Sequence, residues 1–307
     1  MNNFTTHLKL LVVATIWGFG WPAGRVLAND IEPFAASWIR YVIAVLCFLV
    51  FLRISSQWMI PNKSEWKKVA LIGFFSTCVY QAFFMFGMQY TAAGDASLMI
   101  TFNPFFTALL AIVFLDEKMT SRLAVGLTLG ISGVAVLFYY SPNVDISFTD
   151  RAIGDLLIAG AALAWACNSI LMKKAMISPA ENSKEALSPL QLTVWSSVAG
   201  LVFLTPLMLI EMWQYGISQP SYEGWISVIF LAIFSTVISY VWFADGILKI
   251  GAGKSALYVY LVPPIGIYSG YLLLDEKLSP ALLISFILIV GGVLFAQSKS
   301  DKPKEAS

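Results

Sequence analysis

The sequence predicts an all-α polytopic membrane protein with ten transmembrane helices arranged as two inverted five-helix repeats. The first observation behind this prediction is composition: 58% of the 307 residues are hydrophobic and only 12% are charged. A soluble domain carries roughly 25% charged residues. So little polar surface cannot cover a water-facing globule, and the solvent for most of this chain must be lipid.

The second observation is a series of apolar runs, each about 20 residues long, which is the length that crosses a bilayer as a helix. The first run begins near Leu8 and is too long for the apolar core of a cleaved signal peptide, so it is expected to be retained as the first helix. The ten predicted spans are 8–28, 34–53, 67–89, 94–115, 121–140, 153–173, 190–212, 224–246, 254–274 and 281–298.

The third observation is an internal duplication. The stretch 94–118 contains a central Pro104 and ends in Asp-Glu-Lys, and the stretch 253–277 repeats this arrangement around Pro263. The two copies are 159 residues apart. Extending this register without gaps from 66–138 to 225–297 gives 19 identities in 73 positions, including Trp, Pro and Gly residues. Shared hydrophobicity alone does not place such residues in register, so the chain is a duplicated unit.

The duplication divides the chain into a first repeat, about 1–145, a second repeat, about 150–298, and a polar tail, 299–307. Each repeat crosses the membrane five times, an odd number, so the second repeat must be inserted upside down relative to the first. Inverted repeats are a known architecture of secondary transporters, whose substrate site lies near the membrane midplane between the halves. The predicted geometry therefore favours transport by alternating access.

The positions of lysine and arginine predict the orientation, because cytoplasmic loops carry an excess of both. With the amino terminus in the cytoplasm, 15 of the 19 Lys and Arg residues lie on that side and 3 on the other, with Arg40 inside a span. Both termini are therefore expected in the cytoplasm, with the protein in the cell inner (plasma) membrane.

Soluble functions and catalysis find little support. The net charge of +1 gives no basis for a nucleic-acid partner. His7, the single histidine, is expected to be solvated on a polar tail, and the three cysteines lie in apolar runs with no metal-like spacing. No hydrolase or phosphate-binding motif occurs. We expect no enzyme activity, no cofactor and no metal.

The expected partners are a small-molecule substrate and the lipid bilayer. The oligomeric state is open, and a monomer is compatible with the sequence.

Two ionisable residues clearly enter the apolar runs. Arg40 lies about two turns into the second span, where it either meets a substrate carboxylate or snorkels to the interface beside Asp30 or Glu32. Asp245 precedes Lys249 by four residues on the eighth span, and an ion pair on one helix face accounts for it.

Aromatic and amide side chains within the spans are the richer signal for a cavity. Trp17 and Trp165 lie mid-span beside glycine or asparagine, and buried amides must turn inward because an unpaired amide facing lipid is costly. The candidate cavity residues are Trp17, Trp21, Tyr80, Gln81, Phe84, Met99, Phe102, Asn103, Trp165, Asn168, Tyr240, Phe243, Tyr258 and Tyr260. Pro104, Pro263 and Pro264 interrupt helix hydrogen bonding and are candidate hinges, with static kinks as the alternative.

The early Trp17, Gly18 and Pro22, the intramembrane Arg40 and the two Pro–Leu-Asp-Glu-Lys stretches resemble the drug/metabolite transporter superfamily. The resemblance covers nearly the whole chain and is closest to the ten-helix EamA-like branch; within it, the aromatic content resembles the YddG-type aromatic amino acid exporters. It implies a central cavity surrounded by the first, third, fourth, sixth, eighth and ninth helices.

These observations predict a secondary transporter that exports small amphipathic metabolites, foremost aromatic or other hydrophobic amino acids. An alternative keeps the fold and moves another solute, such as a drug-like cation or a sugar phosphate. Alternatives of another class are a membrane-embedded enzyme, which lacks a catalytic pair within the spans, and a non-transporting scaffold, which has no need of two opposed copies.

Overall fold

The structure is a computed structural model that describes residues 3–297 except 115–118, 144, 178–186, 218 and 251. The predicted Asp-Glu-Lys cluster at 116–118 and the tail 299–307 lie outside the described residues. In the described part every regular element is helical. The elements are α1 (Asn3–Asp30), α2 (Pro33–Ile54), α3 (Lys63–Gly73), η1 (Phe74–Val79), α4 (Tyr80–Tyr90), α5 (Ala93–Met99), η2 (Ile100–Phe102), α6 (Asn103–Phe114), α7 (Ser121–Tyr140), α8 (Phe148–Ile177), α9 (Pro189–Tyr215), α10 (Tyr222–Ile229), η3 (Phe230–Ile238), α11 (Ser239–Ile250), α12 (Ala252–Val259), α13 (Val262–Leu274) and α14 (Pro280–Gln297).

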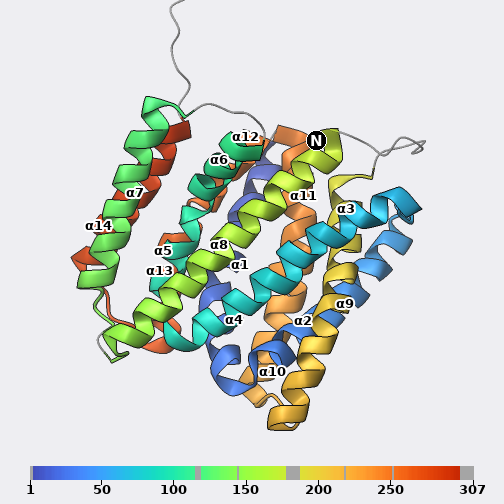
Figure 1. Ribbon diagram of the computed structural model, residues 1–307, viewed down its shortest axis with the longest axis horizontal. Helices are drawn as coiled ribbons and strands as arrows, with labels where there is room; N and C mark the ends of the chain where they lie inside the picture. Colours follow the sequence, from blue (N-terminus) through green and yellow to red (C-terminus); the bar gives the residue numbers. More distant parts are fainter. Residues whose placement is uncertain are drawn as a thin grey trace, which may run out of the picture.

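These elements form ten helical segments that are long and apolar enough to cross a membrane among the described residues (Figure 1). The ten predicted spans and the all-α polytopic fold are confirmed. Several helices extend beyond their apolar runs, because polar caps and charged first turns also support helix formation. The longest, α8, covers 148–177 rather than the predicted 153–173. Its first extra turn carries the charged Arg151 into the bundle.

The helix directions define two faces of the bundle. We call the face where α1 begins, at the top of Figure 1, the terminal face, and the face where α1 ends the opposite face. Near the end of α1, Arg25 Nη1 donates to the carbonyl of Met88 (3.4 Å), which lies close to the end of α4. α8 begins beside the same end of α4, where Thr91 Oγ1 donates to Asp155 Oδ1 (2.5 Å). The first helices of the two halves therefore run in opposite directions, as inverted repeats require.

The two halves also share unusual backbone features at equivalent positions. Both the third and the eighth spans contain a π-helical segment, η1 and η3, over the matching Phe-Ser-Thr triplets. The fourth span is interrupted at η2, just before Pro104, and the ninth between α12 and α13, just before Pro263. Each proline occupies the second position of a new helix, where its missing N–H removes no helical hydrogen bond. The prolines thus divide both spans into two helices.

One pair of helices, α7 and α14, forms a layer at the side of the bundle (Figure 1). Their backbones approach closely at Gly126 and Gly292, where an added Cβ would clash with the facing backbone carbonyl. Small residues allow such close packing between membrane helices. Among the lining residues of the central cavity described below, none comes from α7, and α14 contributes only its last residue, Gln297. This layer therefore lies largely outside the candidate site.

Candidate functional site

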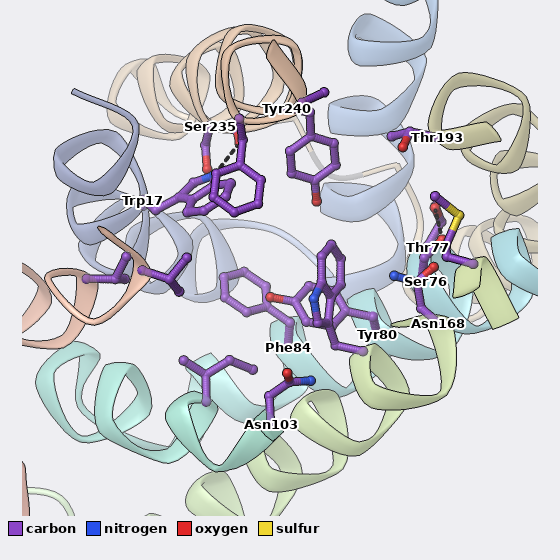
Figure 2. A pocket seen from close by; sticks show the side chains of 18 of the residues that line it. Trp17, Ser76, Thr77, Tyr80, Phe84, Asn103, Asn168, Thr193, Ser235 and Tyr240 are labelled. Carbon is purple, nitrogen blue, oxygen red and sulfur yellow. Dashed lines mark hydrogen bonds between the residues drawn. The ribbon is translucent and has the colours of Figure 1, made fainter. Parts of the chain in front are cut away.

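A cavity of about 480 Å³ lies at the centre of the bundle (Figure 2). Its volume falls within the range of small-molecule sites. The resemblance implied six surrounding helices, whereas the described lining also includes residues of the second and seventh spans and Gln297 at the end of the tenth. Of the residues singled out from the sequence, the lining contains Trp17, Trp21, Tyr80, Phe84, Asn103, Pro104, Trp165, Asn168, Tyr240, Phe243 and Tyr260.

Aromatic rings from four spans form a continuous wall of this cavity. The ring centroid of Trp17 lies 5.2 Å from that of Phe243 and 6.3 Å from that of Tyr240. The wall continues from Tyr240 to Trp165 (6.2 Å) and from Trp165 to Tyr80 (5.3 Å). Trp17 is oriented by its indole Nε1, which donates to the carbonyl of Ser235 in η3 (3.0 Å) (Figure 2). Such a wall offers stacking surface to a planar apolar group.

The three predicted inward-facing amides have different surroundings. Asn103 Nδ2 donates to the carbonyl of Ala162 on α8 (2.9 Å) and thereby joins the interrupted fourth span to the sixth. Asn168 lies on the cavity surface. Gln81 is fully buried behind the cavity wall rather than in it, and its Nε2 donates to Tyr41 Oη (3.3 Å). Two of these amides therefore present polar atoms to the cavity, and the third supports its wall.

Several other candidates lie outside the lining. Met99 is buried in the main hydrophobic core, and Phe102 packs against Phe105 with ring centroids 4.9 Å apart. Pro263 and Pro264 open α13 next to the cavity, of which the neighbouring Val262 is a lining residue. Tyr258 Oη lies 2.5 Å from His7 Nδ1. The expectation of a solvated His7 is wrong, because α1 begins at Asn3 and carries this residue into contact with α12.

The cavity lining also contains Arg40, which the sequence analysis left between the cavity and the interface. The side chain does not snorkel toward Asp30 or Glu32. It is buried, with 6% of its surface exposed, and points into the bundle between the third and eighth spans. The expected pair of Asp245 with Lys249 is present at 2.8 Å, and Lys9 joins it at 3.5 Å.

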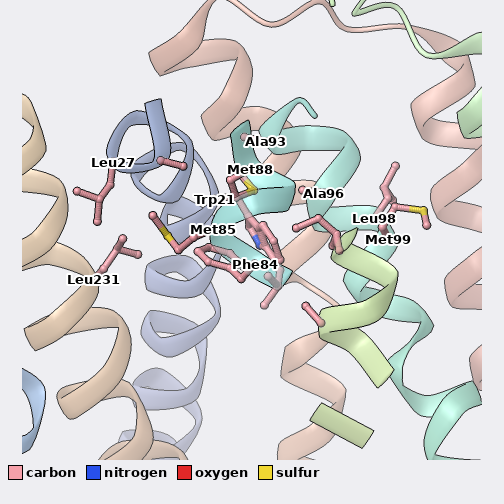
Figure 3. Packing of buried hydrophobic residues seen from close by; sticks show 14 of the residues in the cluster. Trp21, Leu27, Phe84, Met85, Met88, Ala93, Ala96, Leu98, Met99 and Leu231 are labelled. Carbon is pink, nitrogen blue, oxygen red and sulfur yellow. The ribbon is translucent and has the colours of Figure 1, made fainter. Parts of the chain in front are cut away.

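The cavity extends toward one face only. Lining residues near the terminal face include Met172 at the end of α8, Pro189 at the start of α9 and the exposed Gln297. Toward the opposite face, the lining ends at Trp21 and Phe84, whose ring centroids are 5.5 Å apart. Beyond them the buried core, which includes Leu27, Met85 and Met88, fills the bundle (Figure 3). Access is therefore from the terminal face.

A buried polar network lies on the opposite-face side of this core. The carboxylate of Asp95, which is fully buried, accepts from Ser141 Oγ (2.6 Å) and Asn143 Nδ2 (3.1 Å), and lies 4.0 Å from Arg151 Nε. Arg151 also donates to the carbonyl of Phe138 (3.0 Å). Asp155 adds a second carboxylate close by. The sequence analysis missed this network, because each member stands at the edge of an apolar run.

Glu276, from the loop after α13, links the second half to the first. Its two carboxylate oxygens accept from the first two amides of α5, Ala93 N (2.6 Å) and Gly94 N (2.9 Å). These amides have no partners within their own helix, and the helix dipole favours a negative charge there. A Cβ at Gly270 would clash with this carboxylate. Burial raises the pKa of Glu276 above its ordinary value, although the two amide hydrogen bonds and Arg25 oppose the shift.

The comparisons with known proteins agree with this architecture. The model of the EamA-like transporter family matches residues 5–139 and again 152–297, once in each half. The uncharacterized transporter YvbV of Bacillus subtilis is 27% identical over 304 residues, which cover 98% of this chain and 94% of that protein. A probable terminal-alkyne amino-acid exporter of Streptantibioticus cattleyicolor is 23% identical over 97% of this chain and 95% of that protein.

A solved crystal structure shares the fold, with a TM-score of 0.62 at 19% identity over 95% of this chain and 96% of the other. The twofold match of one family model also accounts for the internal duplication. Ten membrane-spanning helices and a central cavity open to one face are the features that a transporter requires. The chain belongs to the EamA-like transporter family.

Proposed function

We propose that this multi-pass membrane protein exports small amphipathic metabolites, foremost aromatic and other hydrophobic amino acids, by alternating access. The observation that carries the proposal is the aromatic wall of a central cavity that reaches one face of the bundle and is closed toward the other. Planar apolar side chains match such a wall in shape and polarity. The resemblance of this chain to a probable amino-acid exporter supports the same substrate class.

A counterflow assay in proteoliposomes tests the proposal. Vesicles preloaded with unlabelled tryptophan, phenylalanine, leucine or aspartate are diluted into labelled tryptophan. Preloading with the first three should drive accumulation of label, and preloading with aspartate should not, because the described lining residues include no second Lys or Arg for a second carboxylate. A drug-like cation or a sugar phosphate that drives counterflow better than every amino acid would replace this proposal with another substrate class.

The Lys and Arg distribution supports a plasma-membrane orientation in which the terminal face lies in the cytoplasm. Topology reporters fused after Lys63 and after Lys184 should therefore report a cytoplasmic location, and one fused after Ser147 a periplasmic location. With this orientation, the structure has the cavity open to the cytoplasm. A cytoplasmic signal from the fusion after Ser147 would contradict both the orientation and the inversion of the repeats.

The aromatic wall predicts the effect of truncating its rings. Trp17→Ala and Trp165→Ala should each raise the apparent KM for tryptophan about 5- to 150-fold, because a ring contributes on the order of 1–3 kcal/mol through stacking and buried area. Trp213→Ala is the matched control, since Trp213 is 84% exposed on the bundle surface. Wild-type kinetics in both cavity variants would show that these rings do not contact the substrate.

We also infer that Pro104 and Pro263 are hinges. They interrupt equivalent spans beside the cavity, so the two parts of each span could move separately. Pro104→Ala and Pro263→Ala should bind substrate with wild-type affinity but turn over several-fold more slowly. Pro206→Ala, which removes a proline within the continuous helix α9, is the control. Unchanged turnover in both hinge variants would assign the prolines to static kinks.

A further inference from the structure

Arg40 is the charged residue of the cavity. Among the described lining residues no other Lys, Arg, Asp or Glu occurs. Arg40 is seven residues beyond Pro33, the first residue of α2, and so lies about 10 Å along the helix from its end. A charge held at this depth is costly unless it has a partner or a function.

The described residues supply Arg40 with hydrogen bonds but with no counter-ion. Its Nη1 donates to Gln81 Oε1 (3.3 Å) and its Nη2 to Thr236 Oγ1 (3.1 Å), both neutral groups. Within the described part of the chain, no Asp or Glu oxygen lies within 4.0 Å of the guanidinium. A guanidinium has five N–H groups, and the Nε of Arg40 has no hydrogen-bond partner among the described residues. The positive charge is therefore available to a ligand.

The two supporting residues hold the guanidinium in one orientation. Gln81 is fully buried and its amide also donates to Tyr41 Oη, so its oxygen is directed at Arg40. Thr236 Oγ1 donates to the carbonyl of Leu231, five residues earlier in the π-helical segment η3, and so uses its lone pairs to accept from Arg40. A fixed fork of N–H donors matches a carboxylate better than a mobile ammonium would.

The surroundings restrict the charge that the site accepts. Arg40 lies 5.7 Å from the ring of Tyr41 and 6.0 Å from that of Phe84, so the guanidinium sits among aromatic surfaces rather than among other cations. A phosphate ester with two charges would retain one unpaired charge in this setting. A cationic ligand would meet a like charge. One negative charge matches the single positive charge.

From these contacts, and resting on the proposed function, we infer that Arg40 binds the carboxylate of the substrate. The apolar part of the same molecule lies against the aromatic wall of Trp17, Tyr240 and Trp165. The substrate class is thereby narrowed to monocarboxylates with an apolar, preferably planar, side group. The α-ammonium group of an amino acid is accommodated but is not the group that determines binding.

Three indole ligands separate these contributions: L-tryptophan, tryptamine, which lacks the carboxylate, and indole-3-propionate, which lacks the ammonium group. Equilibrium binding of each radiolabelled ligand is measured on the full-length protein in nanodiscs. Wild-type protein should bind tryptophan and indole-3-propionate about 10- to 100-fold more tightly than tryptamine, the range expected for hydrogen bonds to a charged group.

Arg40→Gln should lose this preference, so that all three ligands bind within a few-fold of one another. Arg40→Lys should retain part of it, because the charge remains while the fork is lost. Arg53→Gln carries the same substitution at an exposed position of the same helix and should bind as wild type. Size-exclusion profiles establish whether each variant is folded. If Arg40→Gln does not fold, Arg40→Lys still tests the inference.

The outcomes distinguish this inference from the proposed function. If Arg40→Gln keeps the wild-type preference for carboxylates, Arg40 is not the anion site, whether or not tryptophan is transported. If indole-3-propionate shows Arg40-dependent binding while no amino acid drives counterflow, the anion site at Arg40 is supported and the proposal of amino-acid export is rejected. If wild-type protein binds none of the three ligands, or binds tryptamine as tightly as the carboxylates, the inference is overturned.

Discussion

Replacing Arg151 with methionine should destabilise the protein by about 3–5 kcal/mol, the usual cost of removing one partner of a buried ion pair. Arg151 is 5% exposed, and its guanidinium lies next to the buried carboxylate of Asp95. Without it, this carboxylate keeps its bonds from Ser141 and Asn143 but has no cation within 4.0 Å among the described residues. Methionine fills a similar volume, so the loss reports on charge rather than on packing. Unfolding in mixed micelles with increasing denaturing detergent measures the effect.

Two further variants make this prediction specific. The double variant Asp95→Asn with Arg151→Met should recover part of the lost stability, because it removes the unpaired charge at Asp95, while the nearby buried carboxyl group of Asp155 remains. Lys277→Met breaks an ion pair on the same face, with Asp145 at 3.3 Å, but both side chains are more than half exposed. It should cost at most about 1 kcal/mol. Equal losses for Arg151→Met and Lys277→Met would show that the network contributes no more than a surface ion pair.

Replacing Glu276 with alanine should destabilise the protein by roughly 1.5–3 kcal/mol, the range for hydrogen bonds to a charged group. The change removes the acceptor for two amides at the start of α5, and the residue before this helix provides no side-chain cap. Glu276→Gln retains one carbonyl oxygen and should lie between alanine and wild type. Asp275→Asn is the control, because Asp275 is exposed and asparagine accepts its positive φ of 55°. The same denaturing-detergent titration measures all three.

Glu276 also predicts a pH dependence. Burial raises the pKa of Glu276 above its ordinary value of 4.5 in the folded protein. Between 4.5 and the raised pKa, the folded protein therefore retains a proton that the unfolded chain has released. The free energy of unfolding falls as pH rises through this interval. The free energy of unfolding of the wild type minus that of Glu276→Gln should therefore also fall as pH rises through that interval. A pH-independent difference would exclude Glu276 as the titrating group.

The features that the sequence predicted well are local ones. A run of about 20 apolar residues must satisfy its backbone hydrogen bonds within itself in lipid, so each run forms a helix wherever its neighbours lie. The interruptions before Pro104 and Pro263 are local for the same reason, since a proline acts on its own helix. The duplication requires only that the chain be aligned with itself, and the family match in both halves agrees with it.

Residues whose role depends on a distant partner were predicted less well. Asp95 and Asp155 stand near the ends of apolar runs, where a charge usually faces the interface. In the structure the short helix α5 and the first turns of α8 bring the two carboxylates close together, so they are buried with Arg151. Glu276 belongs to a tripeptide that reads as loop charge, and only the position of α5 makes it a helix cap.

For the cavity, the sequence by itself determined which side chains are mid-membrane and too polar or too aromatic to be ordinary lipid contacts. The tertiary structure decided which of them share a surface: Trp17 and Trp165 line the cavity, while Met99 and Phe102 pack in the core. It also decided that Arg40 points inward and has no counter-ion among the described residues. Helical periodicity places a residue on one face of its own helix, but the neighbour of that face is set by packing between helices far apart in the sequence.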